Sequence, residues 1–353
     1  MTVQVIPAAE AIARLAEFST VIDARSQAEY AEDRLPGAVN WPSLTSDERH
    51  LVGTIYKQVS PFEAKKRGAA LVAANVARHI EREVLDKPKG WQPLVYCWRG
   101  GKRSGSLSLV LDQIGFRVSL VDGGYKAFRA AVLAELPALA QRLSYQVICG
   151  PTGSGKTRLL QALADRGTQV LDLEGLAQHR SSVLGLVPGQ PQPSQKQFDT
   201  RVWEQLRRLD PARPVYVESE SKKVGNVAVP EALIAAMRAS PCLRLELPEP
   251  ERVELLMEDY DWFVRQPDFF CDRLGALAEL RGRAVVEDWQ ARVGAGRIRE
   301  VVRELLTQHY DPGYAASIAR NFRQYGTART IAAQDRSMQA MGRLAQELTA
   351  VEG

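Results

Sequence analysis

The chain has 353 residues, of which 45% are hydrophobic and 25% charged, and its formal net charge is +4. These values are typical of a globular protein of about two domains and exclude a disordered or fibrous chain. The four cysteines, Cys97, Cys149, Cys242 and Cys271, form no CxxC pair and no zinc-finger spacing, which argues against a disulfide framework. No stretch resembles a membrane span or a signal peptide, so we expect a cytoplasmic protein without a membrane partner.

Strands and helices alternate along the first part of the chain. Short apolar runs predict strands at 20–24, 93–96 and 117–121, and helical patterns follow at 26–33, 104–115 and 125–136. Strands that alternate with helices are typical of parallel βαβ units. We therefore expect an α/β domain over residues 1–138.

A second run of the same kind begins at Tyr145. It predicts strands at 145–149, 169–173, 215–217 and 241–246, a helix at 156–164, and a Pro/Gly/Gln-rich loop at 184–195. From about residue 250 the pattern is helical, with breaks expected at 294–296 and 311–313. The prediction is a second α/β domain over residues 139–250, followed by a mainly helical C-terminal region over residues 251–353 that packs on it.

Cys97 ends a predicted strand and opens a glycine-containing, basic loop that leads into a helix. Backbone N–H groups in such a loop form a cradle for an anion. The helix dipole and the basic side chains lower the pKa of the thiol, which favours a nucleophilic thiolate over a buried structural cysteine. We predict that Cys97 and Arg103 are catalytic and that the anion loop consists of Trp98, Arg99, Gly100, Gly101, Lys102 and Ser104.

Residues 150–157 read GPTGSGKT and match the P-loop pattern G-x-x-x-x-G-K-[ST] between a predicted strand and a predicted helix. Lys156 would meet the charge of a bound diphosphate, and Thr157 is a candidate ligand for Mg²⁺. The motif predicts phosphate binding, and either a nucleotide or another diphosphate ester would satisfy it. The predicted diphosphate site is Gly150, Thr152, Gly153, Ser154, Gly155, Lys156 and Thr157.

Five further residues are candidates for the surroundings of the P-loop. Asp172, Glu174 and Glu218 follow or end predicted strands, and each is either a site carboxylate or an ordinary capping or surface acid. His179 is a candidate general acid, and Arg180 follows it.

The first domain resembles the rhodaneses, a family of sulfurtransferases. The resemblance rests on the segment VIDARSQAEY with Asp23 and Arg25, on LPGAVN at 35–40, on the Cys97 loop and on DGGY at 122–125. In that family the loop cysteine carries a persulfide or a perselenide. The C-x5-R spacing from Cys97 to Arg103 is longer than in many single-domain rhodaneses, and a longer loop makes a wider cradle for an oxyanion such as a phosphate.

The chain as a whole resembles the tRNA 2-selenouridine synthase family. The segments that carry this resemblance are VGTIYKQ at 52–58, DGGYKAFR at 122–129, DLEGLAQHRSS at 172–182, ESESKKVG at 218–225 and YDPGY at 310–314. The resemblance implies an α/β fold class, with a rhodanese-like α/β domain, a P-loop NTPase-like α/β domain and a helical C-terminal extension. It also implies a transferase that acts on tRNA.

The resemblance implies two steps on 2-thiouridine at the wobble position of the tRNA anticodon. Geranyl diphosphate first alkylates the sulfur, and selenium from selenophosphate then replaces the thiogeranyl group. From the chemistry of the motifs we assign the diphosphate to the P-loop, where Lys156 stabilises the leaving group, and selenophosphate to the Cys97 loop. Cys97 either carries selenium as a perselenide or only positions selenophosphate. No tightly bound cofactor is expected, with Mg²⁺ as a candidate ion, and no oligomeric state is predicted.

Two larger sets of residues are weaker candidates, because core or surface positions explain their members as well. A prenyl chain needs apolar side chains, for which the candidates are Trp203, Tyr260, Trp262, Phe263, Phe269 and Phe270. An anticodon loop needs basic and stacking side chains, for which the candidates are Arg180, Lys222, Lys223, Arg320, Arg323 and Tyr325.

Three other functions fit parts of the sequence. One is a sulfurtransferase coupled to a P-loop kinase or ATPase, which would hydrolyse nucleotide. Another is a C-x5-R phosphatase, which the attached P-loop disfavours, as does Tyr96 at the position before the cysteine. The third is a nucleotide-gated binding protein with a silent rhodanese module, which the intact Cys97 loop disfavours.

Overall fold

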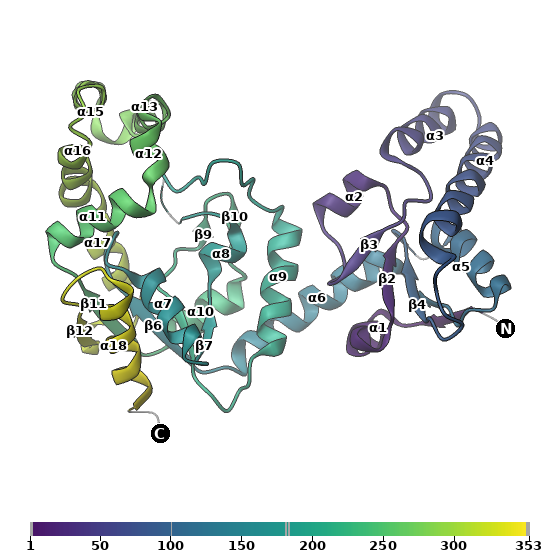
Figure 1. Cartoon of the computed structure of the whole chain (residues 1–353), viewed down its shortest axis with the longest axis horizontal. Coiled ribbons are helices and arrows are strands. Elements are labelled where there is room, and N and C mark those ends of the chain that lie inside the picture. Colours follow the sequence, from purple (N-terminus) through teal and green to yellow (C-terminus); the bar gives the residue numbers. More distant parts are fainter. Residues whose placement is uncertain (1–2, 100, 181, 183, 351–353) are drawn as a thin grey trace. The chain divides into compact units, whose positions relative to one another are not determined.

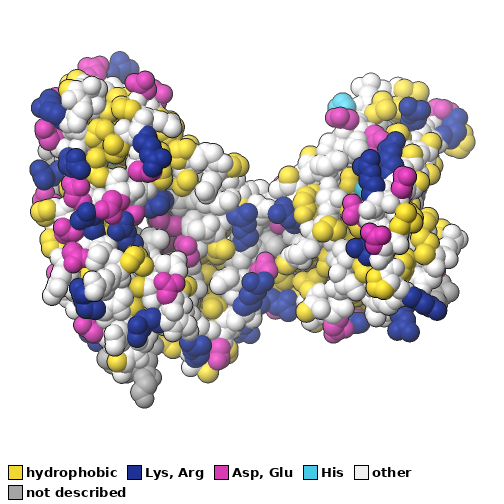
Figure 2. Space-filling view, in the orientation of Figure 1, with side chains coloured by type: hydrophobic (Ala, Val, Ile, Leu, Met, Phe, Trp, Pro, Cys, Tyr) yellow, Lys and Arg dark blue, Asp and Glu magenta, His cyan; other side chains and the backbone are white. Residues whose placement is uncertain are grey.

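The computed structural model describes residues 3–99, 101–180, 182 and 184–350 (Figure 1). The chain divides into two compact units. The first comprises residues 1–135 and 199–204, and the second comprises residues 136–198 and 205–353. On the face seen in Figure 2, each unit carries basic, acidic and apolar side chains intermixed.

The first unit is built on a five-stranded parallel sheet in the order β1-β5-β4-β2-β3. Its strands are β1 (Gln4–Ile6), β2 (Thr20–Asp23), β3 (Ala38–Asn40), β4 (Pro93–Tyr96) and β5 (Ser119–Val121). Its helices are α1 (Ala8–Ala13), α2 (Gln27–Glu32), α3 (Ser46–Gln58), α4 (Pro61–His79), α5 (Lys102–Ile114) and the first part of α6 (Gly124–Gln141), with short helical turns at Leu15–Glu17 and Ile80–Val84.

The central strands of this sheet are covered on both faces, as parallel strands generally are. All four residues of β4 are buried. The core around them contains Ile22, Trp41, Val76, Trp91 and Leu107. This core fixes the carboxyl end of β4, and the Cys97 loop begins there.

The second unit contains a five-stranded parallel sheet in the order β12-β11-β6-β8-β7. Its strands are β6 (Tyr145–Cys149), β7 (Gln169–Leu171), β8 (Val215–Glu218), β11 (Cys242–Glu246) and β12 (Arg329–Ala332), with a small antiparallel pair formed by β9 (Lys223–Val224) and β10 (Val227–Ala228). The helices near it in sequence are α7 (Lys156–Asp165), α8 (Leu173–Ala177), α9 (Gln195–Arg208) and α10 (Glu231–Ala239).

Most of the chain after residue 248 is helical, as expected. The helices are α11 (Glu249–Asp259), α12 (Asp261–Arg265), α13 (Pro267–Gly275), α14 (Ala278–Arg281), α15 (Arg283–Gly294), α16 (Ile298–Glu304), α17 (Asp311–Asn321) and α18 (Met338–Ala350), with short turns at Leu305–Tyr310 and Tyr325–Thr327. The α/β fold class with a helical C-terminal region is thereby confirmed. None of the described helices is long and apolar enough to cross a membrane.

Two features of this region differ from the prediction. The break expected at 311–313 is wrong, because the helical turn Leu305–Tyr310 runs directly into α17. The N–H of Asp311 donates to the carbonyl of Leu306, and Pro312 lies in the first turn of α17. Strand β12 was not predicted, and it completes the sheet beside β11. Met341 of α18 shares a core with Leu159 and Leu163 of α7, so the end of the chain packs on the helix that follows the P-loop.

Candidate functional site

The Cys97 loop lies at the carboxyl end of β4, and its helix α5 begins at Lys102, two residues earlier than predicted. The first turn of α6 holds the loop in place. The N–H of Tyr125 donates to the carbonyl of Cys97 at 2.7 Å, and the N–H of Lys126 donates to that of Trp98 at 3.0 Å. The Trp98 ring also stacks on Tyr125, with 5.5 Å between centroids. Gly100 lies outside the described residues.

The Cys97 thiol is almost fully buried, with 4% of the residue exposed. Ser104 donates a hydrogen bond from Oγ to Cys97 Sγ at 3.1 Å. Burial raises the pKa of Cys97, but hydrogen bonds from Ser104 and the Gly101 backbone, together with the charge of Arg103, more than offset it. The pKa of this thiol therefore lies below its ordinary value, so at a given pH a larger fraction of Cys97 is thiolate than of a free cysteine.

Arg103 is held by an ion pair with Glu29 of α2, at 2.7 Å. Burial raises the pKa of Glu29, but the hydrogen bond and charge of Arg103 outweigh it and lower that pKa to about 2. Ser43 also donates from Oγ to the carbonyl of Arg103 at 2.9 Å. The guanidinium is thus fixed beside the loop, whereas Arg99 and Lys102 are exposed to solvent.

A buried arginine supports the loop from within the first unit. Arg25, 1% exposed, pairs with Asp23 at 2.6 Å and lies over the ring of Tyr125, 4.0 Å from its centroid. Its guanidinium also donates to the carbonyl of Asp33 at 2.6 Å. Buried charges need such partners, and a fully paired network restrains the groups around it. The segment VIDAR therefore holds Tyr125, and Tyr125 holds the Cys97 loop.

The P-loop connects β6 to α7 at the carboxyl edge of the second sheet. Gly153 and Gly155 have φ values of 76° and 87°, a left-handed conformation that other residues adopt at a cost. Lys156 donates from Nζ to the carbonyl of Gly150 at 2.9 Å. Thr157 donates from Oγ1 to the Glu218 carboxylate at 2.7 Å. The loop thus has the conformation and cation that a diphosphate site needs.

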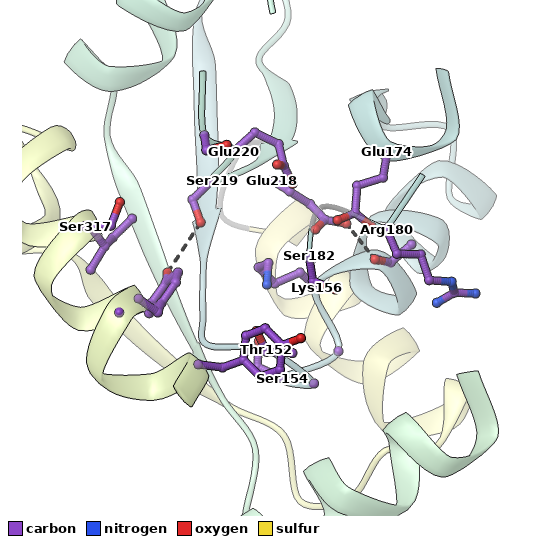
Figure 3. A pocket seen from close by; sticks show the side chains of 18 of the residues that line it. Thr152, Ser154, Lys156, Glu174, Arg180, Ser182, Glu218, Ser219, Glu220 and Ser317 are labelled. Carbon is purple, nitrogen blue, oxygen red and sulfur yellow. Dashed lines mark hydrogen bonds between the residues drawn. The ribbon is translucent and has the colours of Figure 1, made fainter. Parts of the chain in front are cut away.

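A cavity of about 370 Å³ opens over this loop (Figure 3). Residues 152–157 line it, and side chains from several other elements complete it: Glu174, Arg180, Ser182, Glu218, Ser219, Glu220, Tyr260, Tyr310, Tyr314 and Ser317. Its volume is in the range of pockets that bind small molecules. The lining includes cationic, hydroxyl and carboxylate side chains beside apolar ones, and its cations and hydroxyls suit a phosphorylated ligand.

Three carboxylates meet at one side of the cavity. Glu174, Glu218 and Glu220 each offer an oxygen, and these oxygens lie within 4.8 Å of one another. Burial raises the pKa of Glu174, and the charges of Glu218 and Glu220 raise it further. A hard divalent cation relieves such repulsion and prefers oxygen ligands. The residues present therefore fit Mg²⁺, and Thr157 lies beside them through its bond to Glu218.

The remaining candidates near the P-loop divide into two groups. Arg180 lines the cavity, pairs with Asp259 at 3.4 Å and lies over the ring of Tyr260. Asp172 instead caps α8 by accepting from the N–H of Gly175 at 2.8 Å. His179 does not line the cavity, and burial lowers its pKa, so its imidazole is neutral near pH 7. The structure brings Glu174, Glu218 and Arg180 together but leaves Asp172 and His179 outside.

Residues of the C-terminal helices hold the backbone of the P-loop. The Tyr314 hydroxyl accepts from the N–H of Gly150 at 2.6 Å. Arg252 of α11 donates to the carbonyl of Thr152 at 2.8 Å and pairs with Asp311 at 2.6 Å. These residues were not predicted as site residues. The segment YDPGY, which contains Asp311 and Tyr314, was a signal that could have found two of them.

The aromatic candidates for a prenyl chain fall in different places. Trp203 is 1% exposed and donates to Glu135 at 2.7 Å, so it belongs to the core. Tyr260, Phe263 and Phe270 line a small apolar pocket together with Leu184, Leu256, Leu305 and other side chains. Thr152, Ser182, Leu256, Tyr260 and Tyr310 line both this pocket and the phosphate cavity. An apolar pocket therefore adjoins the P-loop cavity.

Among the candidates for RNA contacts, four are exposed at the surface of the second unit: Lys222, Lys223, Arg320 and Arg323. Tyr325 is half-buried, and Arg244 lies over its ring at 4.7 Å. The exposed four are available to an anionic partner, whereas Tyr325 already contacts a cation.

The two loops match two family models. A rhodanese-like domain matches residues 7–131, and the AAA domain of tRNA 2-selenouridine synthase matches residues 143–276. The fold and the two sites thus define a rhodanese-like domain fused to a P-loop domain.

Curated relatives identify the family. Proteins named tRNA 2-selenouridine synthase are similar to this chain: 32% identical in Alcanivorax borkumensis over 85% of this chain and 90% of the relative, and 37% identical in Marinobacter nauticus over 83% and 87%. The relative from Nitrosomonas europaea is 37% identical over 68% of this chain and 63% of its own length. The chain belongs to the tRNA 2-selenouridine synthase family, which confirms the predicted transferase-type enzyme.

Proposed function

We propose that this enzyme converts 2-thiouridine at the wobble position of tRNA to 2-selenouridine through an S-geranyl intermediate, in the cytoplasm. One observation carries the proposal: the P-loop cavity adjoins an apolar pocket lined by Tyr260, Phe263 and Phe270. A polar phosphate site beside an apolar pocket has the polarity that the two halves of a prenyl diphosphate need, and the pocket, with a volume of about 40 Å³, holds only part of the chain. The names of the relatives support a tRNA substrate and a selenium product.

In the first step the thiocarbonyl sulfur attacks C1 of geranyl diphosphate. The C1–S bond forms, the C1–O bond breaks, and diphosphate leaves while N3 of the base loses its proton. Lys156 and the N–H groups of the P-loop stabilise the charge that develops on the leaving group. Mg²⁺ held by Thr157, Glu218 and the neighbouring carboxylates would neutralise part of the diphosphate charge.

In the second step selenium replaces sulfur at C2. The C2–Se bond forms, the C2–S bond breaks, and the thiogeranyl group leaves as a thiolate that takes a proton from water. The Cys97 loop binds the phosphate of selenophosphate through its N–H groups and basic side chains. Fixing the donor next to C2 lowers the entropic part of the barrier.

Cys97 either positions selenophosphate or carries selenium as a perselenide, and the two routes release phosphorus in different oxidation states. If selenium attacks C2 while still bonded to phosphorus, water then cleaves the Se–P bond and releases phosphate. If Cys97 first takes selenium as a perselenide, sulfur and selenium together lose two electrons to phosphorus, and phosphite is released. Once selenium has bonded to C2, a thiol reductant must return two electrons to cleave the Se–S bond and free the Cys97 thiol. Phosphorus NMR of the products distinguishes the routes, since phosphate and phosphite have different spectra.

Nucleoside mass spectrometry tests the proposal. A thiolated anticodon stem-loop is incubated with the enzyme and geranyl diphosphate, and then with selenophosphate. Wild type should produce the S-geranyl and then the seleno-nucleoside. Lys156→Ala should stop before the first product, and Cys97→Ala should accumulate it. Recovery of unchanged thiouridine with wild type would overturn the proposal.

A second candidate is a sulfurtransferase coupled to a P-loop kinase or ATPase. The carboxylates beside Thr157 favour it, because nucleotide-hydrolysing P-loop sites also place acids near the metal. Consumption of ATP without geranylation, lost in Lys156→Ala, would support this candidate instead.

A further inference from the structure

The first unit contains a large apolar groove. It has a volume of about 1300 Å³, and α3, α4 and α5 contribute most of its walls. The lining side chains from α4 include Ala69, Val72, Ala73 and Ala77, and those from α5 include Leu109 and Val110. This volume exceeds the usual range of small-molecule pockets, about 300–1,000 Å³.

The walls of the groove leave apolar surface uncovered. None of the thirteen residues of α3, all of them described, is buried. Tyr56 of α3 is 56% exposed and Leu109 of α5 is 54% exposed. Apolar area left in water forgoes about 25 cal/mol per Å², and exposed apolar patches of this kind commonly mark binding sites.

The groove adjoins the Cys97 loop. Lys102 and Arg103, which end that loop, and Gly105 and Ser106, which follow on α5, belong to its lining. Lys65 of α4 adds another positive charge, and Glu81, just past α4, adds one negative charge. An apolar groove with a basic rim is complementary to an apolar chain attached to an anionic molecule.

We propose that this groove binds the prenyl chain of S-prenylated 2-thiouridine while selenium replaces sulfur. The inference rests on the proposed function and adds a second site for the chain, separate from the pocket beside the P-loop. During the second step, C2 of the base must reach the donor at the Cys97 loop, and the chain is bonded to the sulfur attached to C2. The chain therefore lies next to the loop, where the groove begins, and the basic rim faces the phosphates of the RNA.

A filling substitution tests the groove. Ala73→Trp places an indole among the lining residues, whereas Ala74→Trp puts the same side chain on the same helix at an exposed position outside the lining. With a presynthesised S-geranyl stem-loop and selenophosphate, Ala73→Trp should form selenouridine about tenfold more slowly than wild type. Ala74→Trp should match wild type, and both variants should geranylate the thiolated stem-loop normally.

A photoreactive prenyl chain on the same stem-loop gives a readout that does not depend on turnover. Cross-links should form in peptides from α4 and α5 of wild type and of Ala74→Trp, and should be lost in Ala73→Trp. Cross-links only in other peptides, or none, overturn the inference, as does wild-type selenation by Ala73→Trp. A groove filled by a second copy of the chain would appear as a dimer that Ala73→Trp dissociates, which also overturns it. If wild type neither geranylates nor selenates, the proposed function fails. The cross-links then still show whether the groove binds a prenyl chain.

Discussion

The hydroxyl of Tyr314 accepts a hydrogen bond from the backbone N–H of Gly150 at 2.6 Å, although the two residues are 164 positions apart. Tyr314 belongs to α17 and Gly150 begins the P-loop. The same hydroxyl lies 3.4 Å from Ser219 Oγ, just beyond β8. A helix of the C-terminal region therefore contacts both the phosphate-binding loop and the strand that carries Glu218.

Replacing this tyrosine tests the contact. Tyr314→Phe leaves the N–H of Gly150 without its acceptor, and a buried unsatisfied donor costs about 1–3 kcal/mol. We expect urea unfolding to show a loss of about 1–2 kcal/mol for the second unit. Tyr56→Phe, which removes an exposed hydroxyl from the first unit, is the control and should change little. Equal stability of wild type and Tyr314→Phe would contradict the contact.

The hydrogen bond between Ser104 and Cys97 predicts a pH dependence. Because the bond favours the thiolate, Ser104→Ala should raise the pKa of Cys97. The pH midpoint of Cys97 alkylation by iodoacetamide, followed by peptide mass spectrometry, should lie below that of a free cysteine in wild type and move upward in the variant. Half-buried Cys271, whose pKa is raised by burial, should react at higher pH than Cys97 in both proteins. The same midpoint for the two cysteines of wild type would refute this prediction.

The ion pair between Glu29 and Arg103 predicts an acid-sensitive contribution to stability. The pKa of Glu29 is lowered to about 2 in the folded state, against about 4.3 unfolded, so its contribution is present above pH 4.3 and is lost as pH falls through about 2. Linkage gives about 2–3 kcal/mol at pH 7. Glu29→Gln should lose about that much at pH 7 and converge with wild type near pH 2, as measured by urea unfolding.

Exposed Glu63, paired with Lys66 on one turn of α4, provides the control for that experiment. Glu63→Gln should lose less than about 1 kcal/mol at any pH, because surface ion pairs contribute little. A pH-independent loss in Glu29→Gln would mean that packing, and not the charge, is responsible.

The carboxylate cluster predicts a divalent-cation requirement. In wild type, Mg²⁺ should strengthen the binding of inorganic diphosphate, measured by calorimetry, and removing the metal with EDTA should weaken it. Glu218→Gln should abolish the effect of Mg²⁺, because the amide loses the charge that the cation needs. Glu231→Gln is the matched control, since Glu231 is exposed at the start of α10 and does not line the cavity. A Mg²⁺ effect that survives in Glu218→Gln would rule out this cluster.

The two loops could be predicted because each is a continuous segment. The P-loop pattern and the run from Cys97 to Ser104 contain the glycines, the cations and the helix starts that shape them. The strands that precede the loops, β4 and β6, could be predicted as well, since parallel strands are runs of buried apolar residues. The helical C-terminal region followed from composition and periodicity alone.

Single residues around the loops could be predicted less well. Asp172 and Glu174 are two positions apart, but one caps a helix and the other enters the cavity. A carboxylate at the end of a strand can either cap the next helix or line a cavity, and the residues packed around it determine which of the two it does. His179 was a candidate for the same reason, and burial away from the cavity leaves it neutral.

By itself, therefore, the sequence determined the α/β fold class and the positions of the two loops that follow β4 and β6, because these depend on contacts between neighbours in the chain. The tertiary structure decided which distant residues complete them: Glu29 beside Arg103, and Tyr314 and Arg252 beside the P-loop. It also decided that α3 and α4 form an apolar groove next to the Cys97 loop. Helical periodicity shows that a helix has an apolar face but not what that face meets, because packing partners are set by the fold of the whole unit.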